Sequence, residues 1–91
     1  MADEVPSDVR AVLSQLLTEG RTASADGDLD TVADVVDTVQ RVATNKLPEG
    51  DLRARLLHGC TLLGDELDDD PDTDALVAYF RAMAGELDAA E

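Results

Sequence analysis

The chain has 91 residues with 21 acidic and 7 basic side chains, which give a net charge of −14 at pH 7. This length allows one domain with a modest core, and a hydrophobic share of 44% is too high for a disordered acidic tail. A single cysteine excludes an internal disulfide, and the lack of any apolar run near about 18 residues excludes a membrane-spanning helix.

A first helix is predicted to begin at Ser7, which is a good N-cap residue, and to end before residues 26–27. Residues 1–6 are expected to be a flexible N-terminus, and residues 7–91 are expected to form a single four-helix domain. The apolar residues of the first helix recur at helical spacing, which predicts a buried stripe. The predicted stripe consists of Val9, Val12, Leu13, Leu16 and Leu17.

A second helix is predicted after a cap at Asp28 or Asp30. Its valine-rich run could form a strand, because β-branched residues suit sheets. The spacing favours a helix, since apolar residues recur every three or four positions while Asp30, Asp34 and Asp37 line the opposite face. The predicted inner residues are Leu29, Val32, Val35, Val36, Val39 and Val42.

Residues 44–50 are the clearest predicted linker, because the asparagine and the proline within them both stop helices. A third helix is predicted to begin at Pro48 or Asp51 and to end at the acidic run 68–71. Its inner face is predicted to hold Leu52, Leu56, Cys60, Leu63 and Leu67.

A fourth helix is predicted after a cap at Asp72 or Thr73, with an inner face of Leu76, Val77, Phe80, Met83, Ala84 and Leu87. An echo at an offset of 44 residues pairs Gly20 with Gly64, as two similar helical hairpins would produce. The expected fold class is therefore all-α, with four amphipathic helices arranged as two hairpins. They form either a four-helix bundle or helix pairs that loosely resemble tetratricopeptide repeats.

The acidity has a distinctive composition, because 15 of the acids are Asp and Lys46 is the one lysine. An Asp-rich, Lys-poor surface that keeps its arginines resembles those of proteins from salt-accumulating halophilic archaea. The resemblance implies a small acidic helical protein whose surface holds water and monovalent cations at molar salt, where the Debye length is about 3 Å. The N-terminus has no hydrophobic signal core, so we expect a cytoplasmic protein.

The segment from Asp26 to Asp37 has the carboxylate spacing of a calcium-binding loop. Its acids occupy the EF-hand ligand positions 1, 3, 5, 9 and 12, which fall on Asp26, Asp28, Asp30, Asp34 and Asp37. Thr31 stands where that loop needs glycine, and the helical period that begins at Leu29 leaves no room for a twelve-residue loop. A capped helix with a solvated acidic face is the favoured interpretation, so no metal is expected, and cation binding is the alternative.

His58 and Cys60 suggest a nucleophile or a metal site. Two positions apart on a helix, they point to different faces and do not form a hydrogen-bonded dyad. A structural zinc site needs about four ligands, and the chain offers one cysteine and one histidine. Cys60 lies on the leucine stripe and is predicted to be a small core residue. We therefore expect neither an enzyme nor a cofactor.

Residues 41–58 carry a net charge of +2, while the other 73 residues sum to −16. This local excess of positive charge predicts a non-enzymatic interaction or regulatory module that docks a protein partner through residues 41–58. Self-association of the chain is an alternative. The candidate residues are Arg41, Asn45, Lys46, Arg53, Arg55 and His58. The alternative is internal pairing, of Arg41 with Asp37 and of Arg55 with Asp51, at helical i, i+4 spacing.

A nucleic-acid-binding regulator is a further alternative, in which the third helix presents Arg53, Arg55 and His58 to a groove. The net negative charge argues against it, as it does against an anionic membrane surface. The predicted linker is also longer than the three- or four-residue turn of a helix-turn-helix unit.

Overall fold

The computed structural model describes residues 5–89, and the chain forms four α-helices within them. They are α1 (Ser7–Asp26), α2 (Leu29–Lys46), α3 (Asp51–Asp68) and α4 (Thr73–Ala89). This part of the chain contains no strand, so the predicted all-α fold is confirmed. Of the expected N-terminal segment 1–6, residues 1–4 lie outside the described residues, and Val5 is buried against the bundle.

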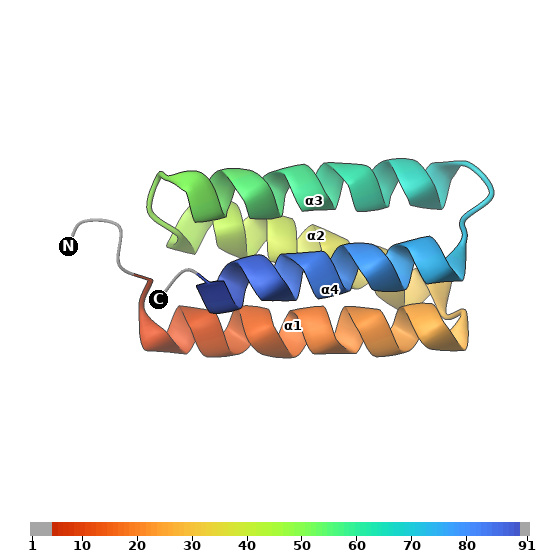
Figure 1. Ribbon diagram of the computed structural model, residues 1–91, viewed down its shortest axis with the longest axis horizontal. Coiled ribbons are helices and arrows are strands. Elements are labelled where there is room, and N and C mark those ends of the chain that lie inside the picture. Colours follow the sequence, from red (N-terminus) through yellow and green to blue (C-terminus); the bar gives the residue numbers. More distant parts are fainter. Residues whose placement is uncertain (1–4, 90–91) are drawn as a thin grey trace.

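The helices run alternately up and down along the long axis of the molecule (Figure 1). Each helix packs against two others, and the contact between α1 and α4 closes the ring. This closure gives a four-helix bundle and not an open stack of helix pairs. The α1–α2 and α3–α4 turns lie together at one end, while the α2–α3 loop lies at the other (Figure 1).

The caps of α1 and α2 follow from local sequence. The turn between them is a Schellman motif, in which the Gly27 N–H bonds to the Ser24 carbonyl and the Asp28 N–H to the Ala23 carbonyl. Gly27 adopts the left-handed φ of 74° that this motif requires. Asp28, one of the two predicted caps, then caps α2 by accepting a hydrogen bond from the Thr31 N–H at 3.3 Å.

The predicted cap at Ser7 is wrong. Ser7 lies inside the first turn of α1, and the N-cap position belongs to Pro6, whose carbonyl accepts a 3.0 Å hydrogen bond from the Arg10 N–H. No side chain caps this end. The ring of Pro6 restricts the backbone at this position to φ −58°, which is close to the helical value.

The predicted linker 44–50 is too long, because α2 continues to Lys46 and the loop comprises residues 47–50 only. Asn45 therefore lies within the helix and does not stop it. The stop comes from Pro48, which disfavours helical backbone at the residue before it. Leu47 is accordingly extended, with φ −91° and ψ 139°, and its side chain is buried.

The core is aliphatic, with Phe80 as its one fully buried aromatic ring among the described residues. Every helix contributes to a single buried cluster. The prediction fails at Val12, which is 48% exposed, because it lies to one side of the stripe through Leu13 and Leu17. The buried residues of α1 are Val9, Leu13, Leu17, Gly20, Ala23 and Ser24.

Two glycines allow α4 to approach its neighbours closely. A Cβ atom added at Gly20 of α1 would lie 2.4 Å from the Phe80 ring, and one added at Gly59 of α3 would lie 2.7 Å from the Met83 sulfur. The close packing of α4 against α1 and against α3 therefore requires glycine at these two positions. Gly64, the counterpart of Gly20 in the sequence echo, faces open space.

Candidate interaction surface

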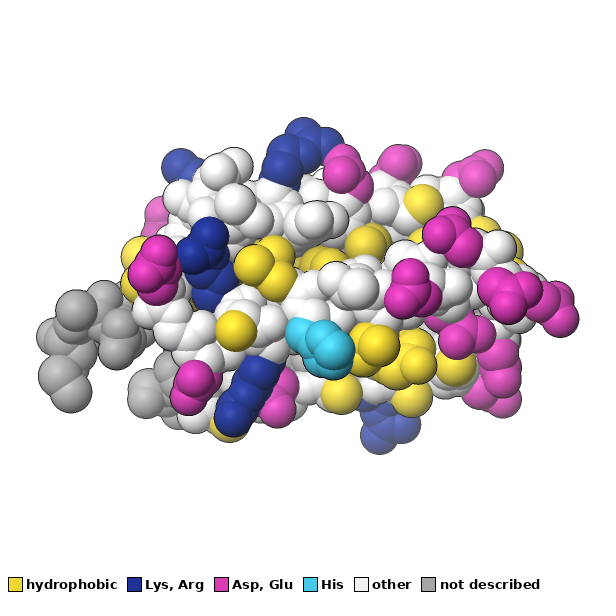
Figure 2. All heavy atoms as spheres, turned by 90° about the horizontal axis from the view of Figure 1, so that it is seen from above, with side chains coloured by type: hydrophobic (Ala, Val, Ile, Leu, Met, Phe, Trp, Pro, Cys, Tyr) yellow, Lys and Arg dark blue, Asp and Glu magenta, His cyan; other side chains and the backbone are white. Residues whose placement is uncertain are grey.

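The six candidate residues lie on the last turns of α2 and the first turns of α3. Asn45 and Lys46 are exposed at the C-terminal end of α2, where a cation suits the helix dipole. Figure 2 looks down on α3 and shows basic side chains over one half of this face, with acidic side chains gathered at the opposite end. The charge asymmetry predicted from the sequence is thus also an asymmetry in space.

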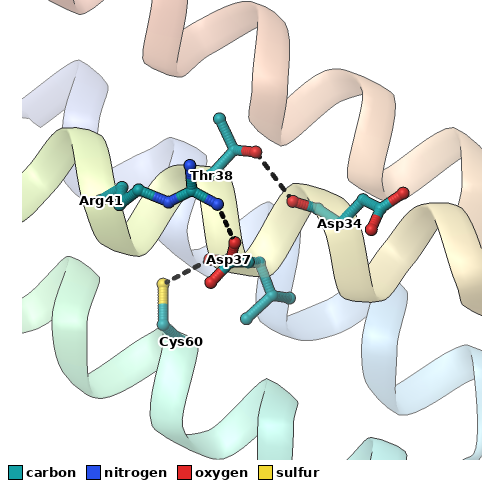
Figure 3. A network of polar contacts seen from close by, with 6 residues as sticks. Asp34, Asp37, Thr38, Arg41 and Cys60 are labelled. Carbon is teal, nitrogen blue, oxygen red and sulfur yellow. Dashed lines mark hydrogen bonds and ion pairs between the residues drawn. The ribbon is translucent and has the colours of Figure 1, made fainter.

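Arg41 is paired within its own helix, as the alternative interpretation of these residues expected. Its guanidinium forms an ion pair with Asp37, one turn earlier (Figure 3). Both side chains are well exposed, at 71% and 62%. Exposed pairs of this kind contribute only about 0–1 kcal/mol, so the pair leaves Arg41 able to exchange partners.

Arg55 is paired with a residue that sequence reasoning did not identify. Its Nη1 lies 2.9 Å from the Glu86 carboxylate of α4, and this contact replaces the expected pair with Asp51. Glu86 follows Arg55 by 31 residues, so the pair depends on how α3 and α4 pack. No local spacing rule could have found it.

Arg53 is the least exposed of the candidate bases, at 27%. Its Nη1 is 3.9 Å from the Glu49 carboxylate, a long ion pair one turn apart. Its Nε is buried and has no hydrogen-bond partner. The Arg53 guanidinium therefore lacks one of its hydrogen bonds. A buried donor without an acceptor is destabilising.

A pocket of about 380 Å³, which we call the α3–α4 pocket, opens between those two helices beside the candidate bases. It includes Arg55 and His58, and small residues on both helices leave the space that it occupies. Figure 2 shows the histidine in cyan next to hydrophobic side chains. The lining residues are Ala54, Arg55, His58, Gly59, Leu62, Tyr79, Ala82, Met83 and Glu86. Sequence reasoning missed the pocket, because its two walls are distant in the chain.

Cys60 is buried in the core, as predicted. Its Sγ lies 3.8 Å from the carbonyl oxygen of Val36 on α2 (Figure 3). Burial raises the pKa of the Cys60 thiol to about 11. His58 is exposed, on a different face of α3. The thiol therefore lacks both the access and the ionisation that a nucleophile requires.

The free energy of unfolding should fall between about pH 9 and pH 11, because the unfolded Cys60 thiol ionises near 9.0 and the buried one near 11. In this range the unfolded chain binds fewer protons than the native chain, so stability decreases as the pH rises. The shift corresponds to about 2–3 kcal/mol in all. Urea unfolding at several pH values across this range should show that the free energy of unfolding falls less per pH unit in Cys60→Ala than in the wild type. An equal fall in both chains would show that Cys60 does not cause the pH dependence.

The carboxylates of the calcium-like spacing do not share a loop. Helix α2 begins at Leu29. The side chains of Asp30, Asp34 and Asp37 therefore lie on successive turns of that helix. The Asp28 carboxylate is already occupied by the backbone N–H and the hydroxyl of Thr31. Within residues 5–89, no group of three or more His, Cys, Asp or Glu side chains is arranged to hold a metal ion.

These features define a class: a small acidic four-helix bundle with a basic surface and an adjoining shallow pocket. A family model described as a domain of unknown function, DUF8101, matches residues 1–89, and the chain belongs to that family. No curated protein and no solved structure matches it. None of the described helices combines the length and the apolar character that a membrane crossing requires.

Proposed function

We propose that this protein is a non-enzymatic interaction module that docks a protein partner through a docking surface at the α2–α3 end. The docking surface consists of Arg41, Asn45, Lys46, Arg53, Arg55 and His58. The observation that carries the proposal is the distribution of charge, with a net of +2 over residues 41–58 of a chain whose total is −14. A surface of this sign attracts a partner segment rich in carboxylates.

The pairing state of the docking surface supports this proposal. Within the described part of the chain, Asn45, Lys46 and His58 are exposed and make no side-chain hydrogen bond or ion pair. The Nη1 of Arg53 lies 3.9 Å from the Glu49 carboxylate, too far for a hydrogen bond. Carboxylates from a partner would supply acceptors to these side chains, and guanidinium–carboxylate contacts give geometric specificity as well as energy.

The setting we propose is the cytoplasm of a salt-accumulating halophile. The support is the Asp-rich, Lys-poor composition, with 15 Asp and one Lys in 91 residues. At molar salt, long-range repulsion between acidic proteins is screened within about 3 Å. Two acidic proteins can then meet, and contacts at short range decide which pairs form.

Replacing Arg53 and Arg55 together by Ala should reduce partner recovery from a molar-salt lysate by about tenfold or more, because both charges contact the partner directly. The measurement is affinity capture with the full chain, followed by direct binding of the recovered protein in purified form. Circular dichroism must show that the variant is folded.

The matched control replaces two other arginines, Arg21→Ala and Arg81→Ala, which are exposed on α1 and α4. This control should capture the partner as the wild type does. Equal capture by the Arg53/Arg55 variant would overturn the proposed docking surface. Capture that disappears after nuclease treatment, together with a salt-dependent mobility shift of DNA, would replace the protein partner with a nucleic acid.

A further inference from the structure

The α3–α4 pocket adjoins the docking surface and shares Arg55 and His58 with it. Its volume of about 380 Å³ lies within the range of about 300–1,000 Å³ that is usual for binding pockets. The space exists because Ala54, Gly59 and Ala82 line it with small side chains or none. The rest of the lining is mostly apolar, and Figure 2 shows hydrophobic side chains exposed beside the histidine. The docking surface therefore offers an apolar contact in addition to its charges.

We propose that the α3–α4 pocket receives an aromatic side chain carried by an acidic segment of a partner protein. This inference rests on the proposed function and names the chemistry of its partner. An apolar pocket favours an apolar group, and the net charge of +2 over residues 41–58 favours carboxylates next to that group. A few buried anchors, aromatic ones above all, supply most of the affinity of protein interfaces.

The lining of the pocket favours an aromatic group over an aliphatic one. The thioether of Met83 lines the pocket, and sulfur makes favourable contacts with the edges of aromatic rings. Gly59 leaves room for this sulfur, because a Cβ atom added there would lie 2.7 Å from it. Tyr79 adds a half-buried ring, and two aromatic rings attract each other by more than their buried area accounts for.

An ion pair bounds the pocket and joins its two walls, since Nη1 of Arg55 on α3 lies 2.9 Å from the Glu86 carboxylate on α4. These two charges balance, so the other bases of the docking surface attract the acids of the partner segment. Lys46 is exposed and, within residues 5–89, makes no ion pair. On the face in Figure 2, most basic side chains lie to one side of the histidine and most acidic ones to the other. The carboxylates beside the aromatic residue therefore lie toward the α2–α3 loop.

The aromatic group comes from a different protein, because a second copy of this chain exposes none. The sequence contains two aromatic residues, Tyr79 and Phe80. Phe80 is 1% exposed in the core, and Tyr79 is part of the pocket wall. The one large apolar side chain that is well exposed among the described residues is Val12 on α1, which is aliphatic.

The probe is an acetylated and amidated pentapeptide with a central phenylalanine between two pairs of aspartates. Titrated to about 10 mM in about 2 M potassium chloride, it should shift the amide NMR signals of Gly59, Leu62 and Met83. The same peptide with a central alanine should bind more weakly by about tenfold or more, because it leaves the pocket empty. A central leucine should weaken binding about threefold, because it lacks the ring contacts. Lysines in place of the aspartates should weaken binding by about threefold or more.

Ala54→Trp and Ala82→Trp test the pocket from its two walls. Both alanines are exposed lining residues, so an indole at either position occupies the pocket without disturbing the core. Each variant should bind the phenylalanine peptide about tenfold more weakly. The matched control is Ala78→Trp, at an exposed position one turn earlier on α4 that does not line the pocket. It should bind the peptide as the wild type does, and circular dichroism must show that all three variants are folded.

The inference would be overturned by the absence of shifts at the pocket, by equal binding of the phenylalanine and alanine peptides, or by normal binding in both pocket variants. Equal binding of the leucine peptide would contradict the aromatic anchor, and equal binding of the lysine peptide would contradict the acidic segment. The proposed function is judged separately, by the capture experiment with the Arg53/Arg55 variant. If that variant loses the partner while the peptides ignore the pocket, the docking surface stands without it. If that variant captures the partner normally, the docking surface is wrong whatever the peptides do.

Discussion

Raising potassium chloride from dilute buffer to about 2 M should raise the free energy of unfolding by about 2–4 kcal/mol and the Tm by about 10–25 °C. The reason is the concentration of acids at one end of the bundle, where segments 26–34 and 65–74 hold eleven of the 21. Two carboxylates 10 Å apart in water repel each other by about 0.4 kcal/mol, and folding brings many such pairs together. Thermal unfolding followed by circular dichroism across a salt series measures the effect.

The control for this salt response neutralises part of the acidic end, as Asp68→Asn/Asp69→Asn/Asp70→Asn. These side chains are exposed, and Asp70 has a φ of 48°, which asparagine adopts readily. The variant should be more stable than the wild type in dilute buffer and should gain less from salt. General salting-out affects both chains alike, so the difference between them isolates the charge effect. Parallel salt curves would show that repulsion at this end is not the cause.

The helices and the core could be predicted from the sequence because their signals are local. The spacing of apolar residues identified all four helices, and the structure selects Asp28 from the two predicted caps of α2. Cys60 was assigned to the core from its place on the leucine stripe, and it is 4% exposed. Errors of a few residues arose where two local signals competed, as at Asn45 and Pro48.

The geometry of the candidate surface could not be predicted, because it depends on contacts between residues far apart in the chain. The Arg55–Glu86 pair and the α3–α4 pocket both require α3 and α4 to be placed side by side. The local excess of positive charge at residues 41–58 was visible in the sequence. The ion pairs of the basic residues in this segment could not be predicted, because Arg41 follows the i, i+4 rule and Arg55 does not.

Gly20 and Gly64 also show that sequence does not predict contacts between helices. The 44-residue echo pairs these two glycines, but only Gly20 packs against another helix in the structure. Gly20→Ala should destabilise the fold by about 2–3 kcal/mol, because its Cβ would enter a packed core and a fully buried ring has little room to move. That Cβ would lie within 2.9 Å of three Phe80 ring atoms, and Phe80 is 1% exposed. Urea unfolding at neutral pH measures the change.

Gly64→Ala is the matched control, because an added Cβ there meets nothing within 4 Å. It should stabilise the chain by up to about 1 kcal/mol, since alanine is the better helix former. Combining Gly20→Ala with Phe80→Leu tests the contact itself. The double variant should be at least about 1 kcal/mol more stable than the sum of the single effects predicts, because the smaller side chain makes room for the methyl group. If Gly20→Ala instead stabilised the chain as Gly64→Ala does, α1 and α4 would not approach each other as closely as the bundle requires.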